Sequence, residues 1–285
     1  MGVIPPHLPY QRRHAMKPFA TALALSLTIA CPTLAFAAGA SDTDAERLAR
    51  WNEIRTSIFG DKAVQPTETL VKVDAPVRAL DAALVPITLT MPEPGKVAGV
   101  SLVIDDNPSP YAANITFGPA ADPSEIKLRV RVNNYTNVHA VVRTKDGGLF
   151  ETAKFVKASG GCSAPMGMSD EEAMKGMGDM RMKFAEGPHG AKSTEATLMI
   201  RHPNFSGMQM NQITRDYTPA RYIQKVVVSQ GARNILTLDG DISIASNPVI
   251  NFAFLPEGTA PVTVVASDNQ DGRWEHSFPV PSPSN

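Results

Sequence analysis

The chain has 285 residues, of which 43% are hydrophobic and 19% charged, and its formal net charge at pH 7 is −1. This composition is typical of a soluble globular protein, and the near balance of charges implies neither a nucleic-acid partner nor an anionic membrane. The length suits one large domain or two ordinary ones.

Residues 1–37 have the three-part layout of a cleavable secretory signal. Three basic residues precede an apolar stretch at residues 19–30, and the small residues Ala35 and Ala37 suit signal peptidase. The apolar stretch is shorter than the roughly 20 residues that span a bilayer. We expect cleavage after Ala37 and a soluble mature protein in the periplasm, with no membrane association. Loss of those basic residues lowers the count of Lys and Arg from 27 to 24, against 28 acidic residues.

The N-terminal sequence also bears on the export route and on the residue at which translation starts. Arg12 and Arg13 resemble the pair of a twin-arginine signal, but the Ser/Thr and Phe that normally accompany the pair are missing, so Sec-type export is favoured. Translation can start at Met1 or at Met16, and Met16 leaves the more ordinary signal. A lipoprotein site at Cys31 is disfavoured by the residues before it and by the proline after it.

Residues 42–162 are predicted to form a strand-rich domain that begins with a short helix at residues 42–58. The segment Ile126-Lys-Leu-Arg-Val-Arg-Val132 alternates apolar and basic residues, which is typical of a strand with one buried face. Lys145-Asp-Gly-Gly148 supplies the glycines of a tight hairpin. Further strands are expected at residues 85–90, 97–104, 138–143 and 149–156.

Cys162 closes this domain and is the only cysteine left once Cys31 leaves with the signal. An odd cysteine in an exported protein indicates an intermolecular bond or a free reactive thiol. Gly160, Gly161 and Pro165 are typical of a loop, so we expect Cys162 to be exposed on a flexible arm. Without a basic neighbour, the pKa of the thiol should stay near the free value of about 8.5.

Residues 163–192 are predicted to be a linker. Ser169, followed three residues later by Glu172, has the pattern of a capping box, so a helix should begin there and run to about Phe184. Six of the ten methionines that remain after signal cleavage lie in the linker: Met166, Met168, Met174, Met177, Met180 and Met182.

Residues 193–285 repeat the strand pattern, with turn-forming residues between the strands. The strands are expected at residues 194–200, 225–229, 235–239, 249–254, 262–267 and 274–280. Short strands spaced by turns are typical of antiparallel sandwiches. The sequence therefore predicts an all-β protein with two β-sandwich domains joined by a Met-rich, partly helical linker.

Other chemistries have little support. Zinc binding is disfavoured because no two histidines after the signal are four residues apart and no CxxC motif occurs. A Cys–His hydrolase would need His189 or His202 beside Cys162, and no hydrolase motif surrounds that cysteine. Nucleotide-binding motifs are absent, so no cofactor is expected. Copper(I) stays open as an alternative, because thiolate and thioether ligands select it and Met166 and Met168 follow Cys162 closely.

The first domain contains Val85-Pro-Ile-Thr-Leu89, Val103-Ile-Asp-Asp-Asn-Pro-Ser-Pro110, Leu128-Arg-Val-Arg-Val132, Val138-His-Ala-Val-Val142 and Phe155-Val-Lys-Ala-Ser-Gly-Gly-Cys162. These segments resemble SoxY, the sulfur-carrying subunit of the bacterial sulfur-oxidation system. In that family the cysteine of a terminal Gly-Gly-Cys-Gly-Gly arm holds sulfur intermediates covalently. The resemblance implies attachment of sulfur at Cys162, with Gly160 and Gly161 as the flexible arm.

The second domain contains Ile200-Arg-His-Pro203, Asp216-Tyr-Thr-Pro-Ala-Arg-Tyr-Ile223, Ser246-Asn-Pro248 and Ser267-Asp-Asn-Gln-Asp-Gly272. These segments resemble SoxZ, the partner subunit, and the order SoxY then SoxZ resembles the fused SoxYZ-like carriers found beside quinoprotein alcohol dehydrogenases. The resemblance implies immunoglobulin-like sandwiches, halves that pack together within the chain, and no enzymatic activity. It also implies partner enzymes from a periplasmic sulfur-oxidation system, which acts on compounds such as thiosulfate, or from a quinoprotein dehydrogenase system.

The chain departs from the family at the arm, where Ser163-Ala164-Pro165 replaces the trailing glycines and both ends are tethered. The main hypothesis is a periplasmic carrier whose Cys162 forms a persulfide or related sulfur adduct and presents it to partner enzymes. The alternative is a copper-handling or accessory binding protein for a periplasmic quinoprotein alcohol dehydrogenase, with Cys162, Met166 and Met168 as Cu(I) ligands.

Overall fold

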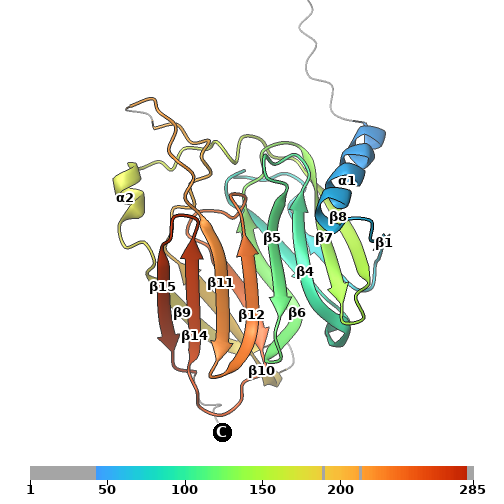
Figure 1. The fold of residues 1–285 in the computed structure, drawn as a ribbon, viewed down its shortest axis with the longest axis vertical. Coiled ribbons are helices and arrows are strands. Elements are labelled where there is room, and N and C mark those ends of the chain that lie inside the picture. Colours follow the sequence, from blue (N-terminus) through green and yellow to red (C-terminus); the bar gives the residue numbers. More distant parts are fainter. Residues whose placement is uncertain (1–42, 188–189, 212–213, 281–285) are drawn as a thin grey trace, which may run out of the picture. The chain divides into compact units, whose positions relative to one another are not determined.

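The computed structural model of the chain describes residues 43–187, 190–211 and 214–280 (Figure 1). The signal predicted at residues 1–37 lies outside these ranges, together with Cys31 and both possible start residues. Among the helices in the described ranges, none is long and apolar enough to cross a membrane.

Two sheets pack face to face to form a sandwich. The nine-stranded sheet contains, in spatial order, β1 (Val64–Pro66), β8 (Leu149–Val156), β7 (Thr136–Thr144), β4 (Val97–Ile104), β5 (Tyr111–Phe117), β12 (Arg233–Gly240), β11 (Ile223–Gln230), β14 (Val262–Asp268) and β15 (Arg273–Phe278). The six-stranded sheet contains β2 (Lys72–Asp74), β3 (Val85–Thr90), β6 (Ala121–Val130), β13 (Val249–Phe254), β10 (Gly190–Ile200) and β9 (Met180–Gly187). A short 3₁₀ helix, η1 (Pro94–Lys96), precedes β4. The predicted all-β, immunoglobulin-like sandwich fold is confirmed.

Both sheets run without a break through the N-terminal half, residues 43–162, and the C-terminal half, residues 180–280. β5 pairs with β12, where Ile115 is opposite Leu238. β6 pairs with β13, where Ile126 is opposite Phe252. All four side chains are buried in one apolar cluster. The halves therefore pack within the chain through main-chain pairing and a shared core.

Most of the predicted elements are present, and one central strand was not predicted. The helix expected at residues 42–58 is α1 (Asp44–Phe59), which begins with a capping box between Thr43 and Glu46. The sequence missed the short strands β1 and β2 as well as the central strand β5, whose Tyr111-Ala-Ala-Asn-Ile-Thr-Phe117 lacks clear alternation. Its neighbours β4 and β12 supply its backbone partners, and this tertiary pairing overrides its weak strand propensity.

The predicted helix of the linker is much shorter than expected. The N-cap is confirmed, because the Ser169 side chain accepts a hydrogen bond from the backbone N–H of Glu172, but α2 (Asp170–Met174) stops after five residues. Gly176 and Gly178 both have positive φ and lead into β9. The continuation to Phe184 was wrong, because Met180-Arg-Met-Lys-Phe184 alternates in the way a strand does and pairs with β10.

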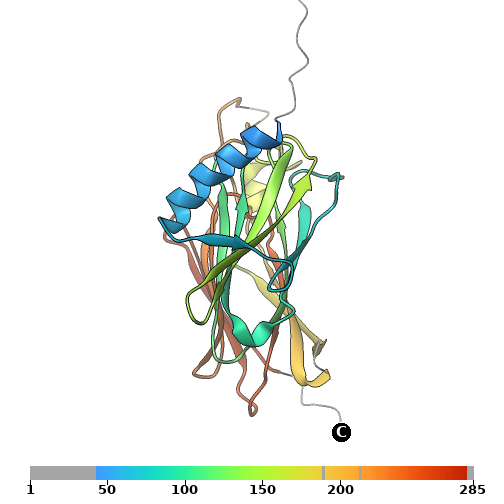
Figure 2. The same cartoon turned by 90° about the vertical axis from the view of Figure 1, so that its right-hand side faces the viewer.

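α1 lies across the outer face of the nine-stranded sheet in the N-terminal half (Figure 2). Its Trp51 ring stacks on His139 of β7, with the centroids 3.7 Å apart. The two ring nitrogens of His139 face Asp105 at 3.2 Å and Glu151 at 3.0 Å. Burial alone would lower the pKa of His139, but hydrogen bonds to these two carboxylates outweigh it and raise the pKa. The two carboxylates therefore favour the charged form of His139, which lies beneath the Trp51 ring of α1.

Candidate functional site

Residues 157–169 lead from β8 toward α2 at one end of the sandwich (Figure 1). Within this segment, Cys162 lies in a turn. The backbone N–H of Ser163 donates to the carbonyl of Gly160 at 3.2 Å, which closes the turn. The predicted loop is confirmed, but the predicted exposure of the thiol is wrong. Cys162 is a free cysteine with 0% of its surface exposed.

The two glycines before Cys162 hold the turn against the N-terminal half. The N–H of Gly160 donates to the carbonyl of Asn133 at 2.8 Å, and that of Gly161 to the carbonyl of Val132 at 3.1 Å. A Cβ atom added to Gly161 would lie 2.0 Å from the carbonyl oxygen of Ala82, which is closer than any real contact. Glycine is therefore required here for close backbone approach, and its role as a flexible arm stays a prediction.

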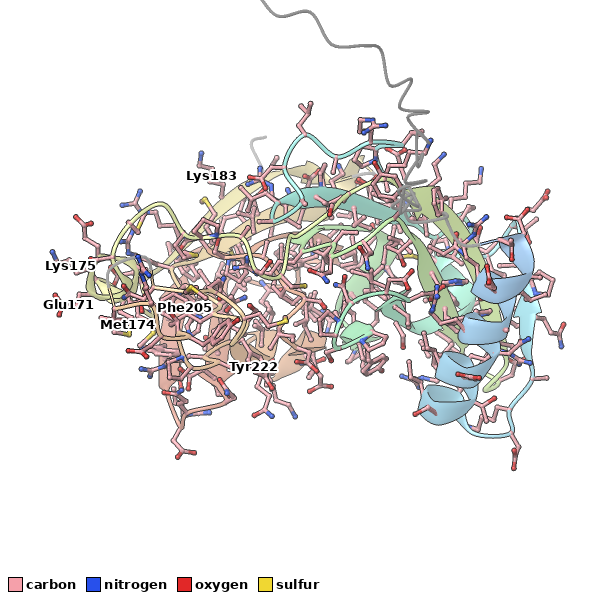
Figure 3. All side chains as sticks on the ribbon, turned by 90° about the horizontal axis from the view of Figure 1, so that it is seen from above. Glu171, Met174, Lys175, Lys183, Phe205 and Tyr222 are labelled. Atoms are coloured by element: carbon pink, nitrogen blue, oxygen red, sulfur yellow. The ribbon has the colours of Figure 1, made fainter. Side chains whose placement is uncertain are left out.

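The other side of the turn is covered by the long segment of residues 201–222 in the C-terminal half. The hydroxyl of Ser206 donates a hydrogen bond to the backbone carbonyl of Cys162. The N–H of Ser206 donates in turn to the side-chain oxygen Oε1 of Gln209 at 2.8 Å. Phe205, labelled in Figure 3 at the end of the molecule away from α1, is buried beside this contact. Cys162 is therefore enclosed by both halves of the chain.

Arg131 is a buried basic neighbour that the sequence did not predict. Its Nη1 donates to the carbonyl of Gly161 at 3.2 Å and its Nη2 to the carbonyl of Asn204 at 3.1 Å. The alternating pattern places Arg131 on a solvent-facing position, but β6 ends at Val130 and the guanidinium turns inward, where only 1% of the residue is exposed. No local signal in the sequence marks this change of direction.

Burial dominates the electrostatics of the thiol. It raises the pKa of Cys162 to about 11, and the nearby positive charge of Arg131 offsets only part of this effect. Burial likewise lowers the pKa of Arg131. The Nε of Arg131 has no hydrogen-bond partner among the described residues. The enclosed thiol is therefore protonated at neutral pH, with an incompletely paired cation beside it.

A buried polar network holds the covering segment in place. The Nε2 of His202 lies 3.4 Å from Asp268, and the Nδ1 of His202 accepts from the N–H of Asn204 at 3.1 Å. Arg221 donates from Nε to the same carboxylate oxygen of Asp268 at 2.7 Å. Both ring nitrogens of His202 are thus engaged away from Cys162, which leaves it no role as a hydrolase base. His189, the other candidate, lies outside the described residues.

Met166 and Met168 line a pocket of about 360 Å³ beside the cysteine turn. One wall is formed by residues 165–170, and the other by Gln209, Met210, Asn211 and Thr218. Cys162 is not part of this lining, so the three proposed Cu(I) ligands do not share one pocket. No group of three His, Cys, Asp or Glu side chains arranged to hold a metal ion occurs within the described ranges.

Two family models match the chain in succession. The model described as sulfur oxidation protein SoxY matches residues 55–162 and so ends on Cys162. The model described as sulphur oxidation protein SoxZ matches residues 182–279, beginning inside β9. The boundary between the two matches falls in the segment that carries α2 and the methionine-lined pocket.

Among solved structures, the chain is similar to the sulfur carrier protein SoxY from Chlorobium limicola f thiosulfatophilum. The two are 28% identical, with 40% of this chain and 96% of the other covered and a TM-score of 0.35. A β-glycosidase from Bacteroides vulgatus is 9% identical over 75% of this chain and 25% of its own length, with a TM-score of 0.21. A search of curated proteins gave no match.

Proposed function

Because the chain is a fused SoxYZ-like protein, in which a SoxY domain precedes a SoxZ domain, we propose that it is a periplasmic carrier of sulfur intermediates and that Cys162 is the attachment site. It is not an enzyme; its partners supply the chemistry. The observation that carries the proposal is that the SoxY match ends on Cys162, the one cysteine in that match.

The attachment is a sulfur–sulfur bond at the Sγ of Cys162. When a partner presents its own persulfide, the Cys162 thiolate attacks the terminal sulfur atom. The new bond to Sγ forms as the sulfur–sulfur bond of the partner breaks, and the partner leaves as a thiolate. The transferred sulfur keeps its proton and no net oxidation occurs, so the carrier needs no cofactor of its own.

The enclosure of Cys162 supports a closed resting state for such a carrier, in which the thiol is kept from reaction. The thiolate is the reactive form of cysteine, and burial holds the pKa of Cys162 near 11, so the enclosed thiol resists oxidation and reaction with the wrong acceptor. Loading requires the turn to leave Ser206 and Arg131. Released into water, the thiol returns toward the ordinary pKa of about 8.5 and becomes reactive.

Presentation differs from that of a free terminal arm, because residues 163–169 tie the turn to α2. A partner therefore has to meet Cys162 close to the end of the sandwich. We propose that these partners are enzymes of a sulfur-oxidation or quinoprotein dehydrogenase system in the periplasm.

The test is the intact mass of the protein purified from its native periplasm, measured with and without reductant. We expect sulfur-sized increments that reductant removes and that are absent in Cys162→Ser. Ser159→Ala, an exposed change in the same loop, should keep them. A mass that never exceeds that of the bare chain, whatever reduced sulfur compound or alcohol supports growth, would overturn the proposal.

A further inference from the structure

The space around the thiol of Cys162 is filled. None of the residue's surface is exposed, so the described residues leave no water-sized gap beside its sulfur atom Sγ. A persulfide adds a second sulfur atom directly to Sγ, and this atom is larger than a water molecule. Protein interiors are packed as tightly as organic crystals, and an inserted group forces its neighbours to move. A loaded Cys162 therefore fits here only if part of the site is displaced.

The wall that backs the turn in the N-terminal half is main chain. A Cβ atom added to Gly161 would lie 2.0 Å from the carbonyl oxygen of Ala82 and 2.6 Å from that of Val132. These two residues are themselves joined, because the N–H of Val132 donates to the carbonyl of Ala82 at 2.8 Å. The turn therefore has no room to retreat into this half.

The opposite wall is the covering segment 201–222, and Asn204 fixes it. The side-chain Nδ2 of Asn204 donates to the carbonyl of Ala245 at 3.0 Å, and its Oδ1 accepts from the N–H of Ile223 at 3.0 Å. Asn204 has no exposed surface, so moving it would leave buried polar groups unpaired, which is costly. This wall is therefore harder to displace than the turn.

The cysteine turn, residues 160–167, is the part that can move. Gly160 and Gly167 at its two ends both have positive φ, and a Cβ atom at Gly167 would meet nothing within 4 Å. Between them, Ser163 and Pro165 are exposed. Hinges are a few residues that absorb large changes of φ and ψ, and glycine does so without steric cost. The turn can therefore swing outward while both sheets stay in place.

The charge of an adduct acts in the same direction as its volume. Burial raises the pKa of Cys162 to about 11 although Arg131 is near, so the closed site disfavours a negative charge on sulfur. Both Nη atoms of Arg131 already donate to backbone carbonyls, and Asp81, the other charged group that acts on Arg131, is exposed. Compared with an ordinary thiol, this pKa corresponds to a bias of roughly a hundredfold toward the open turn when the sulfur is anionic.

We propose that the cysteine turn responds to its load: a sulfur adduct on Cys162 frees the turn from Ser206 and Arg131, so the loaded carrier displays its cargo and the empty carrier withdraws its thiol. An anionic adduct holds the turn open more strongly than a neutral adduct of the same size. An enzyme that removes sulfur then meets loaded turns, and empty carriers do not compete for it. That the load is sulfur rests on the proposed function; the response of the turn to an adduct does not.

The test places adducts on Cys162 chemically, in the full mature chain of residues 38–285, where it is the one cysteine. The reagents are the symmetric disulfides of β-mercaptopropionamide and of β-mercaptopropionic acid. The Cys162 thiolate attacks one sulfur of the reagent, whose sulfur–sulfur bond breaks as the bond to Sγ forms, and the other half leaves as a thiolate. The reaction is run in denaturant and the protein is refolded. The two adducts have the same shape, and only the acid is charged at pH 7.

The readout is hydrogen exchange at the backbone N–H groups of Gly160 and Gly161, which donate to carbonyls of the N-terminal half in the closed turn. We expect exchange about tenfold faster with the amide adduct than with the free thiol. The carboxylate adduct should accelerate it about tenfold again. The N–H of Gly147, which donates to the carbonyl of Thr144 in a distant hairpin, should exchange at one rate in all three proteins.

A matched control moves the adduct to an exposed position of the same loop. The double variant Ser159→Cys with Cys162→Ser carries the same two adducts outside the enclosed site. Its Gly160 and Gly161 should exchange at the same rate with and without an adduct.

Unchanged exchange at Gly160 and Gly161 with both adducts on Cys162 would overturn the proposal. Equal acceleration in the control variant would do the same. Faster exchange throughout β11 and β12 would show that the adduct unfolds the protein instead of releasing the turn, and equal rates for the two adducts would overturn the role of charge. Because the adducts are placed chemically, a native protein that carries no sulfur would overturn the proposed function without altering these results.

Discussion

The hydroxyl of Ser206 donates a hydrogen bond to the backbone carbonyl of Cys162. A residue of the C-terminal half thus anchors the turn that carries the cysteine of the N-terminal half. A fused chain keeps these two residues together at every concentration. The turn that carries Cys162 is therefore held in part by the half of the chain that does not contain it.

Removing this contact should make the thiol more accessible. In Ser206→Ala, the turn loses its bond to the covering segment, and we expect Cys162 to react with a disulfide reagent at least severalfold faster than in wild type at the same pH. Ser159→Ala should react at the wild-type rate. Equal rates for all three proteins, with Ser206→Ala folded by circular dichroism, would show that the Ser206 contact does not gate access.

The reactivity of Cys162 should depend on pH in the manner of a buried thiol. With a pKa of about 11, the thiolate fraction at pH 8 is about two orders of magnitude below that of an ordinary cysteine. Labelling in native buffer should therefore be slow and should keep accelerating up to about pH 11. In denaturant, the labelling rate of the same protein should instead level off above about pH 8.5. A native labelling profile with that lower midpoint would contradict burial of the thiol.

Gly161 should be intolerant of a side chain. In Gly161→Ala the new Cβ would overlap the carbonyl oxygen of Ala82, so the turn must move outward. We expect a loss of about 1–3 kcal/mol in the free energy of unfolding and faster labelling of Cys162. Gly95→Ala is the matched control, since a Cβ there meets nothing within 4 Å. Denaturant titration and thiol labelling of both variants check the prediction.

The docking of α1 should weaken at alkaline pH. The pKa of His139 is raised in the folded state, so its contribution to stability is complete below about pH 6.5, the ordinary histidine value, and is lost as the pH rises through the raised pKa. Unfolding free energies measured from pH 6 to pH 9 should fall in wild type. The decrease in unfolding free energy over this pH range should be smaller in His139→Gln, whereas His276→Gln should show the same decrease as wild type.

Much of the fold follows from local pattern. The alternation at residues 126–132, the glycines at Lys145-Asp-Gly-Gly148 and the cap at Ser169 each lead to the element observed there. The failures have two causes. The helix expected to run to Phe184 overlooked the local strand alternation of β9. β5 and the end of β6 depend on neighbours distant in the sequence, and a local pattern carries no information about which neighbour will be present.

The candidate site could likewise be predicted from the sequence only in part. The loop at Cys162 follows from its glycines and proline, and attachment of sulfur there is what the resemblance to SoxY implies. The resemblance gives Gly161 to a flexible arm, which stays a prediction, and the structure adds that Gly161 lets the turn approach Ala82 closely. Arg131 and Gln209 had no sequence signal at all, because their roles come from burial and from the orientation of single polar groups.

The sequence by itself determined that this chain is all-β, that it carries a SoxY-like part before a SoxZ-like part, and that Cys162 lies in a loop. Only the tertiary structure decided that the cysteine is enclosed. Burial depends on what packs over a residue, and the cover over Cys162 is a segment about 40 residues further along the chain, with Ser206 at the contact. The same folding that joins the two halves into shared sheets thus encloses the thiol and raises its pKa.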